Sequence, residues 1–438
     1  MKLLKKVVVF ILTLESKLIL RTYRPFIIAV TGSVGKTSTK DAIYSVLKDQ
    51  SRYVRKSEKN LNSEIGLPLT VIGVPNAWHS VAGWLSNIRA GLRLIVSRQE
   101  YPDCLILEVG ADHPGDIRKV AKWLKPDIAV ITRVSSMPVH VEFFASPEAV
   151  FEEKASLADR IKAGGTVILF ADEKGMSIAR RPLVKGARII SFGLASEADV
   201  RASQYVMTYS DSEGMRIPTG FSFQLEIDAT RSPISMKGIL GEAYVYPLLA
   251  AAAVGKAKGM KPEQISRSIS AYGAPKGRMN IIPGKNNSTI IDDTYNSSPD
   301  AVEAALETLK KLETNGTSRR IAILGDMMEL GKYSADEHRK AGALAAGIVS
   351  RLVTVGQRSR GTALEAIAHG LSANAVESFD SAQDAALHMR DLIQTGDLIL
   401  VKGSQSIRME SIVKVLMNEP EKAGELLVRQ EKEWLEKE

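Results

Sequence analysis

Short apolar runs alternate with longer amphipathic stretches through most of the chain. The runs at residues 25–30, 104–107, 127–131 and 166–170 are largely apolar from end to end, as in strands that are buried on both faces of a parallel sheet. The stretches between them carry apolar residues at helical spacing. This alternation predicts an α/β fold in which helices cover a mostly parallel sheet.

The pattern changes between about residues 188 and 240, where polar and apolar residues alternate and turn residues are frequent, as from Phe221 to Ile227. We expect an antiparallel addition to the first sheet here. An alanine-rich helix from about 243 to 258 follows, and the turn-rich segment 271–278 is the candidate linker.

Beyond the linker the α/β rhythm restarts, with predicted strands at 288–291, 320–324, 352–355 and 397–401. Ser298 followed by Pro299 predicts a helix start with serine as the N-cap. The tail from 419 to 438 reads as a charged helix in contact with solvent.

The N-terminal segment is apolar and basic. Lys2, Lys5 and Lys6 precede an apolar run that ends at Leu14, but charged residues follow without a small-residue cleavage site, unlike a signal peptide. Eight apolar residues are too few to span a bilayer. A helix packed on the protein body and a helix on a membrane surface both fit this pattern.

Composition narrows the class of protein. A chain of 438 residues with 45% apolar and 25% charged residues predicts two to four globular domains. The net charge of +8 does not separate anionic small molecules, membranes and nucleic acid as partners. The single cysteine, Cys104, excludes an internal disulfide and a multi-cysteine zinc site, and favours the cytoplasm.

A glycine-rich loop joins the first predicted strand to a helix at residues 31–38. Backbone N–H groups of such a loop and the helix N-terminus can wrap a polyphosphate. Lys36 would reach the β and γ phosphates, and Thr37 would offer its hydroxyl to Mg²⁺. The glycine spacing is shorter than in the common P-loop because residue 30 is valine. The strand, loop and helix together predict nucleotide binding.

Three further residues are candidates for the same chemistry. Glu108 directly follows the strand 104–107, where a carboxylate could bind a phosphate-bound Mg²⁺. His140 lies among apolar residues and Lys154 on a predicted helix, and the spacing alone assigns neither to a metal.

Taken together, these segments resemble the Mur ligases, ATP-dependent amide-forming enzymes of peptidoglycan synthesis. The segments that carry the resemblance extend in the family's order from residue 26 to about 415 and comprise 31–38, 60–68, 108–117, 140–144, Lys154, 277–279, 291–299, 324–331 and 401–404. The last three resemble in particular the subfamily that adds D-alanyl-D-alanine to UDP-N-acetylmuramoyl-tripeptide.

The resemblance implies a domain plan and a set of site residues. It implies an N-terminal helical segment 1–25, a central P-loop domain 26–283 and a Rossmann-like α/β domain 284–438. Glu108 would bind one Mg²⁺, and His140 a second together with a carbamate formed from CO₂ on Lys154. The ATP site would comprise Thr31, Gly32, Ser33, Val34, Gly35, Lys36, Thr37, Ser38, Arg278, Asp292, Asp293, Tyr295 and Asn296. The substrate residues would be Asn62, Lys402 and Ser404.

The implied reaction is phosphorylation of the acceptor carboxylate by ATP, followed by attack of the dipeptide amine on the acyl phosphate. Catalysis would rest on Lys36, Glu108, His140 and Lys154. We expect a cytoplasmic monomer that acts on small molecules and does not bind nucleic acid. A Mur-like ligase for a different carboxylate and a non-catalytic ATP-binding scaffold in a cell-wall complex remain alternatives.

The chain departs from the family pattern in several places. A UDP-sugar-binding domain normally precedes the P-loop, whereas about 25 residues do so here, so we expect another part of the chain to bind that group or a different acceptor. Tyr244, Pro247 and Arg133 replace asparagines expected near the base and the loop, and Ser156 replaces an acidic residue. The helical stretch within 79–98 has an apolar stripe beside arginines, which fits contact with a diphosphate, contact with a membrane surface, or packing against the protein's own core.

Overall fold

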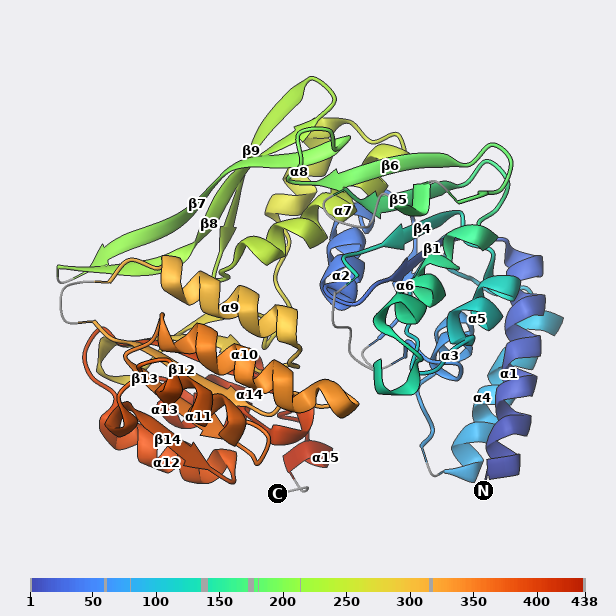
Figure 1. Ribbon diagram of the computed structural model, residues 1–438. Coiled ribbons are helices and arrows are strands. Elements are labelled where there is room, and N and C mark those ends of the chain that lie inside the picture. Colours follow the sequence, from blue (N-terminus) through green and yellow to red (C-terminus); the bar gives the residue numbers. More distant parts are fainter. Residues whose placement is uncertain are drawn as a thin grey trace.

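A computed structural model describes residues 2–58, 61–78, 80–134, 141–171, 177–179, 181–212, 214–314 and 318–435 (Figure 1). The described chain contains a nine-stranded sheet in the order β2-β3-β1-β4-β5-β6-β7-β8-β9 and a six-stranded sheet in the order β10-β11-β15-β12-β13-β14. The α/β class is therefore confirmed.

The first sheet combines parallel strands with an antiparallel extension. Its strands are β1 (Phe26–Thr31), β2 (Val54–Lys56), β3 (Cys104–Glu108), β4 (Ile128–Ile131), β5 (Thr166–Phe170), β6 (Arg188–Gly193), β7 (Val200–Ser212), β8 (Met215–Ile227) and β9 (Thr230–Lys237). The antiparallel prediction is correct for β7, β8 and β9 but wrong for β6, which pairs in parallel with β5. Arg188 and Ile189 are exposed at the start of β6, so this strand lacks the continuous apolar run of a parallel strand that is buried along its whole length.

Helices cover both faces of this sheet. One face carries α2 (Lys36–Leu47), α7 (Val245–Ala257) and α8 (Pro262–Ser270); the other carries α1 (Lys2–Tyr23), α3 (Gly66–Ile72), α4 (Val81–Val96), α5 (Asp116–Leu124) and α6 (Pro147–Ala155). Along β1, Ile28 and Val30 join the core beneath α2 and α7, whereas Ile27 and Ala29 join the core beneath α1 and α3. The strand is thus buried on both faces, as its apolar run predicts. None of the described helices is both long and apolar enough to cross a bilayer.

The second sheet has five parallel strands and an antiparallel edge. Its strands are β10 (Asn280–Pro283), β11 (Thr289–Asp293), β12 (Arg320–Gly325), β13 (Arg351–Val355), β14 (Val376–Phe379) and β15 (Leu398–Lys402). The helices α9 (Pro299–Lys311), α10 (Ser334–Ala346) and α11 (Arg360–Ala368) cover one face, and α12 (Ala382–Leu392) and α13 (Glu410–Leu416) the other. Segment 271–279 links the sheets. Because β10 pairs with β11, the second sheet begins before the predicted boundary at residue 284.

The C-terminal tail folds back onto the second domain, so the prediction of one solvated helix is wrong. Two short helices, α14 (Ala423–Leu426) and α15 (Lys432–Leu435), flank buried Leu427 and Val428. The Arg429 guanidinium pairs with the buried Glu410 carboxylate at 2.7 Å. It also donates hydrogen bonds to the carbonyls of Thr294, at 2.6 Å, and Tyr295, at 3.2 Å.

Candidate active site

The loop between β1 and α2 needs glycine at two positions. Gly32 has φ +147°, and a Cβ placed there would lie 1.9 Å from the hydroxyl oxygen of Thr132 at the end of β4. Gly35, with φ +81°, directly precedes the first turn of α2. The Thr132 hydroxyl donates to the Val34 carbonyl at 2.8 Å, so β4 fixes the loop from its other side.

The ammonium group of Lys36 folds back over this loop. Its Nζ donates to the carbonyls of Gly32, at 3.0 Å, and Ser33, at 3.3 Å. Burial lowers the pKa of Lys36, while the Coulombic attraction of Glu108 acts in the opposite direction. The group therefore lies where the phosphates of a nucleotide wrapped by this loop would need a cation.

Glu108 ends β3 and is nearly buried, with 6% of its surface exposed. Its carboxylate accepts hydrogen bonds from the Thr37 hydroxyl, at 3.0 Å, and from the Asn62 amide, at 3.3 Å. The Lys40 ammonium lies 3.7 Å away. Asn62, a predicted substrate residue, thus makes a hydrogen bond to Glu108, the predicted metal ligand. Lys40 was missed, although its place one helical turn after Lys36 indicates it.

Thr37 and Glu108 together suit Mg²⁺, which prefers hard oxygen ligands and takes the rest of its shell from phosphates and water. Within the described ranges, no group of three or more His, Cys, Asp or Glu side chains could hold a metal by itself. His140, the predicted ligand of a second metal, lies outside the described residues.

Lys154, on α6, extends to the same loop. The helix begins at Ser146, whose side chain accepts from the Ala149 N–H, with Pro147 in the first turn. Only 4% of Lys154 is exposed, and its Nζ donates to the Gly32 carbonyl at 3.0 Å. Burial, and secondarily the nearby charge of Lys36, lower the pKa of Lys154 to about 7. A large fraction of this amine is therefore neutral and nucleophilic at neutral pH.

The loop at residues 31–38, Glu108 and Lys154 line one wall of a cleft. The linker and the second domain supply the opposite wall. The Arg278 guanidinium lies over the Tyr295 ring, 4.2 Å from its centroid, and the Arg278 Nε is buried without a hydrogen-bond partner. The cleft encloses about 930 Å³, including space open to solvent, and its walls include Lys36, Thr37, Asn62, Glu108, Lys154, Arg278, Tyr295, Asn296 and Gln405. Gln405 was missed because no local pattern marks it.

Four other predicted residues support this wall from inside the second domain. Asp292 accepts from the N–H and the hydroxyl of Thr294, and burial raises the pKa of its carboxyl to about 6. The Lys402 ammonium pairs with Asp293 at 2.6 Å and donates to the Asn296 carbonyl at 3.0 Å. Ser404 accepts from the Met328 N–H at 3.0 Å. Lys402 and Ser404, predicted to lie near the dipeptide, thus make internal contacts that hold the strand ends together.

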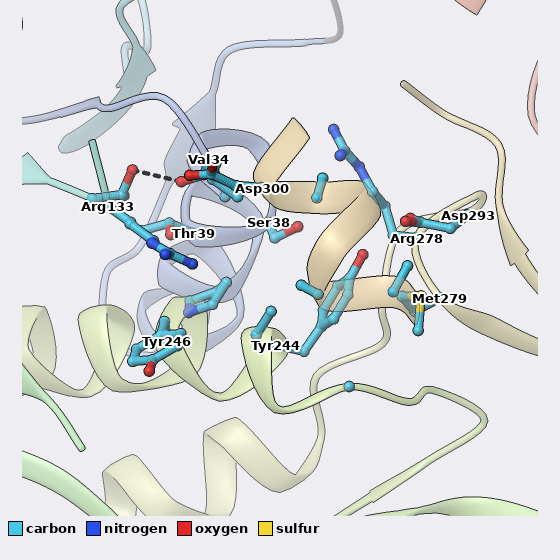
Figure 2. A pocket seen from close by; sticks show the side chains of 18 of the residues that line it. Val34, Ser38, Thr39, Arg133, Tyr244, Tyr246, Arg278, Met279, Asp293 and Asp300 are labelled. Atoms are coloured by element: carbon cyan, nitrogen blue, oxygen red, sulfur yellow. Dashed lines mark hydrogen bonds between the residues drawn. The ribbon is translucent and has the colours of Figure 1, made fainter. Parts of the chain in front are cut away.

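A second, mostly apolar pocket of about 820 Å³ adjoins the cleft, and the two share Val34, Gly35 and Arg278 as walls. Figure 2 shows Arg133 and Tyr246 on one side of it, Arg278 and Asp293 on the other, and Tyr244 between them. Three of the four residues that depart from the family pattern, Arg133, Tyr244 and Pro247, line this pocket. Its aromatic and aliphatic lining suits a planar base.

Comparison with known proteins identifies the family. The family model "Mur ligase middle domain" matches residues 30–83 and 86–255, and the model "Mur ligase, glutamate ligase domain" matches residues 277–405. The chain belongs to the Mur ligase family. Members of this family are ATP-dependent ligases that form amide bonds, so the chain is an enzyme of that class.

Individual Mur ligases match most of the chain. It is 30% identical over 399 residues to the UDP-N-acetylmuramoyl-tripeptide--D-alanyl-D-alanine ligase of Bacillus subtilis, covering 90% of this chain and 76% of the relative. The enzyme of that name from Mycobacterium leprae is 30% identical over 410 residues, covering 90% and 74%. The crystal structure of MurF from Acinetobacter baumannii superposes with a TM-score of 0.73 at 25% identity, covering 92% of this chain and 79% of that chain. MurF ligase from Thermotoga maritima in complex with ADP shares the fold, with a TM-score of 0.75 at 22% identity over 94% and 84% of the chains.

Proposed function

We propose that this Mur ligase adds D-alanyl-D-alanine to UDP-N-acetylmuramoyl-tripeptide, using ATP, in the synthesis of peptidoglycan precursors. The observation that carries the proposal is the single cleft in which Lys36, Glu108 and Lys154 of the first domain face Arg278 and Tyr295. The names of the two relatives that match 90% of the chain supply the substrates.

ATP fits the two adjoining pockets. With its base between Tyr246 and Pro247 in the apolar pocket, its phosphates would pass Val34 and Gly35 and reach Lys36. Arg278 borders both pockets and would contact the phosphates from the linker side. The Arg278 Nε without a partner is consistent with an anionic ligand there.

Mg²⁺ would be held by the Thr37 hydroxyl and the Glu108 carboxylate. When bound, the ion supplies positive charge to the phosphoryl oxygens during transfer. Lys36 adds a second cation at the same oxygens. Asn62 and Lys40 hold the Glu108 carboxylate in place, because one donates a hydrogen bond to it and the other lies within ion-pair distance.

We also propose that Lys154 is carbamylated. Its neutral amine attacks the carbon of CO₂, an N–C bond forms, a proton leaves to solvent, and the side chain then carries one negative charge. Burial and a pKa near 7 favour this step over a permanent ammonium. The carbamate oxygens, with His140, would hold the second Mg²⁺.

The acceptor carboxylate would attack the γ-phosphorus and displace ADP. The dipeptide amine would then attack the acyl phosphate, and phosphate would leave from the tetrahedral intermediate. Residues of both domains line the cleft, so closure of the domains around the substrates would exclude water from the acyl phosphate. Because one chain supplies all these side chains, we propose that it acts as a monomer, and the unpaired Cys104 fits the cytoplasm.

Phosphate release from ATP tests the proposal, with Mg²⁺ and bicarbonate present and UDP-N-acetylmuramoyl-tripeptide and D-alanyl-D-alanine supplied singly and together. We expect release only with both substrates, and a product with their summed mass less water. Lys154→Gln should abolish turnover, whereas the matched variant Lys162→Gln, at a half-buried lysine outside the cleft, should retain it. If the folded protein binds ATP but releases no phosphate with the two substrates together, the substrate assignment is wrong. A ligase for a different carboxylate or a scaffold role then takes its place.

A further inference from the structure

Two helices of the first domain present large apolar side chains to solvent. They lie at the outer edge of that domain, away from the second sheet (Figure 1). Phe10 is 70% exposed, Leu85 64% and Val96 82%. The exposed apolar residues are Val7, Phe10, Leu14 and Leu18 of α1, and Val81, Leu85, Leu92 and Val96 of α4. We call these two sets the α1 stripe and the α4 stripe.

The two helices run parallel and in contact. Near their C-terminal ends, the Tyr23 hydroxyl donates to the Leu94 carbonyl at 3.0 Å. About one helical turn before Leu94, Gly91 of α4 faces Glu15 of α1 so closely that a Cβ on Gly91 would lie 2.3 Å from the Glu15 carboxylate. Glu15 and Gly91 therefore mark the contact line between the helices.

Both stripes lie on the same side of this line. At 3.6 residues per turn, the α1 stripe is centred roughly 95° from Glu15 in one sense, and the α4 stripe roughly 110° from Gly91 in the opposite sense. When two parallel helices face each other, side chains displaced from the contact line in opposite rotational senses lie on the same side of the helix pair. The buried faces of both helices, marked by Leu12 and Leu94, point toward the body of the domain. The stripes therefore form one continuous apolar face.

Cations border this face on both sides. Arg89 and Arg93 border the α4 stripe on the side of α4 that is turned away from α1. Lys17 and Arg21 border the α1 stripe on the side of α1 that is turned away from α4. All four side chains are exposed. Residues 2–25 and 80–98 contain nine Lys and Arg but one acidic residue, Glu15, and Glu15 is buried.

The basic border on the α1 side widens into a groove between α1 and α5. The groove is lined by Lys17, Arg21, Arg24, Lys119, Lys122 and Lys125, together with Trp123. Of the lysines and arginines along it, only Lys162 makes an ion pair with a carboxylate of the described chain, Asp127 at 2.7 Å. Such a concentration of positive charge attracts anionic partners.

We propose that the α1 and α4 stripes and their basic borders form a docking surface for an anionic lipid bilayer. The apolar side chains would enter the headgroup boundary while the flanking cations meet lipid phosphates, as in an interfacial amphipathic helix. A second copy of the chain fits poorly, because a two-fold contact through this face would bring the same cations together. The surface is independent of the ligase reaction proposed above.

Vesicle flotation of the full chain tests the proposal. We expect binding to phosphatidylglycerol-containing vesicles, weaker binding at high salt, and little binding to phosphatidylcholine alone. Phe10→Ser with Leu85→Ser should lower the partition coefficient at least roughly tenfold, because two large apolar side chains no longer insert. Arg89→Glu with Arg93→Glu should lower it roughly 25-fold or more on the anionic vesicles, since each cation near such a surface contributes roughly fivefold and the new carboxylates are repelled.

Matched controls keep the test specific. Leu364→Ser removes an equally exposed apolar side chain on α11, 70% exposed, and Lys237→Glu reverses an exposed charge at the end of β9. Both should bind vesicles like the unmodified protein. Equal binding to the two vesicle types, an equal loss in the control variants, or a dimer that the Phe10 and Leu85 variants dissociate would overturn the proposal. Unchanged thermal unfolding of all variants separates lost docking from lost folding, whether or not the ligase reaction is as proposed.

Discussion

Glu15 is a carboxyl group enclosed between α1 and α4. Its relative exposure is 3%, and neither of its oxygens has a hydrogen-bond partner in the described chain. Because burial penalises the charged form, the pKa of Glu15 rises from 4.5 to about 7. The packing of α1 against α4 therefore favours the protonated, neutral form of Glu15.

The sign of the effect follows from proton binding. Between pH 4.5 and 7 the folded protein holds this proton and the unfolded chain does not, so the free energy of unfolding falls as pH rises through that window and is level above it. The difference between 4.5 and 7, at about 1.4 kcal/mol per pH unit, amounts to about 3 kcal/mol at high pH. About 2.5 kcal/mol of this develops between pH 5 and pH 8.

Glu15→Gln removes the ionisation. Urea unfolding at pH 5, 6, 7 and 8 can be followed by fluorescence, since three of the four tryptophans, Trp78, Trp84 and Trp123, lie in this part of the chain. We predict that the stability of the variant relative to the unmodified protein grows by about 2.5 kcal/mol from pH 5 to pH 8. The exposed control Glu263→Gln should change by less than about 0.5 kcal/mol throughout. A stability difference for Glu15→Gln that stays constant with pH refutes the reasoning.

Three further substitutions test the site. Gly32→Ala should lower ATP affinity roughly tenfold or more in calorimetry, because the new Cβ meets Thr132 and the backbone conformation disfavours a side chain; affinity equal to the unmodified protein contradicts the loop geometry. Glu108→Gln should reduce Mg²⁺-dependent turnover by roughly 10² to 10³, while ATP binding in EDTA persists; unchanged turnover would remove Glu108 as the metal ligand. Lys402→Met should destabilise the second domain by about 3–5 kcal/mol in urea unfolding, because Asp293 is left buried without its partner. Adding Asp293→Leu should restore most of the lost stability, and a double variant as unstable as Lys402→Met would argue against the pair.

The sequence predicts those parts of the fold that local patterns determine. Strands buried on both faces have nearly continuous apolar runs, so β1, β3, β4 and β5 were predicted within a residue or two. The loop at residues 31–38 has the composition that phosphate binding requires, and Glu108 follows a buried strand. The structure brings these residues to one cleft, and their roles stay predictions: Lys36, Thr37, Asn62, Glu108, Lys154, Arg278, Tyr295 and Asn296.

The remainder depends on contacts between segments far apart in the chain. The fold-back of the tail rests on the ion pair of Arg429 with Glu410 and on carbonyls beyond β11, and composition gives no sign of such pairing. Gln405 reaches the cleft only because β15 ends beside β11. The α4 stripe has the spacing of a buried helix face, and only the packing of α1 beside it shows that Leu85 and Val96 stay exposed.

The step on which the proposed function depends is activation of the acceptor carboxylate as an acyl phosphate. The most direct test uses UDP-N-acetylmuramoyl-tripeptide labelled with ¹⁸O in its terminal carboxylate, together with ATP and D-alanyl-D-alanine, and mass analysis of the released phosphate. We expect one ¹⁸O atom in each phosphate that accompanies amide formation. Amide formation with unlabelled phosphate would contradict this activation step.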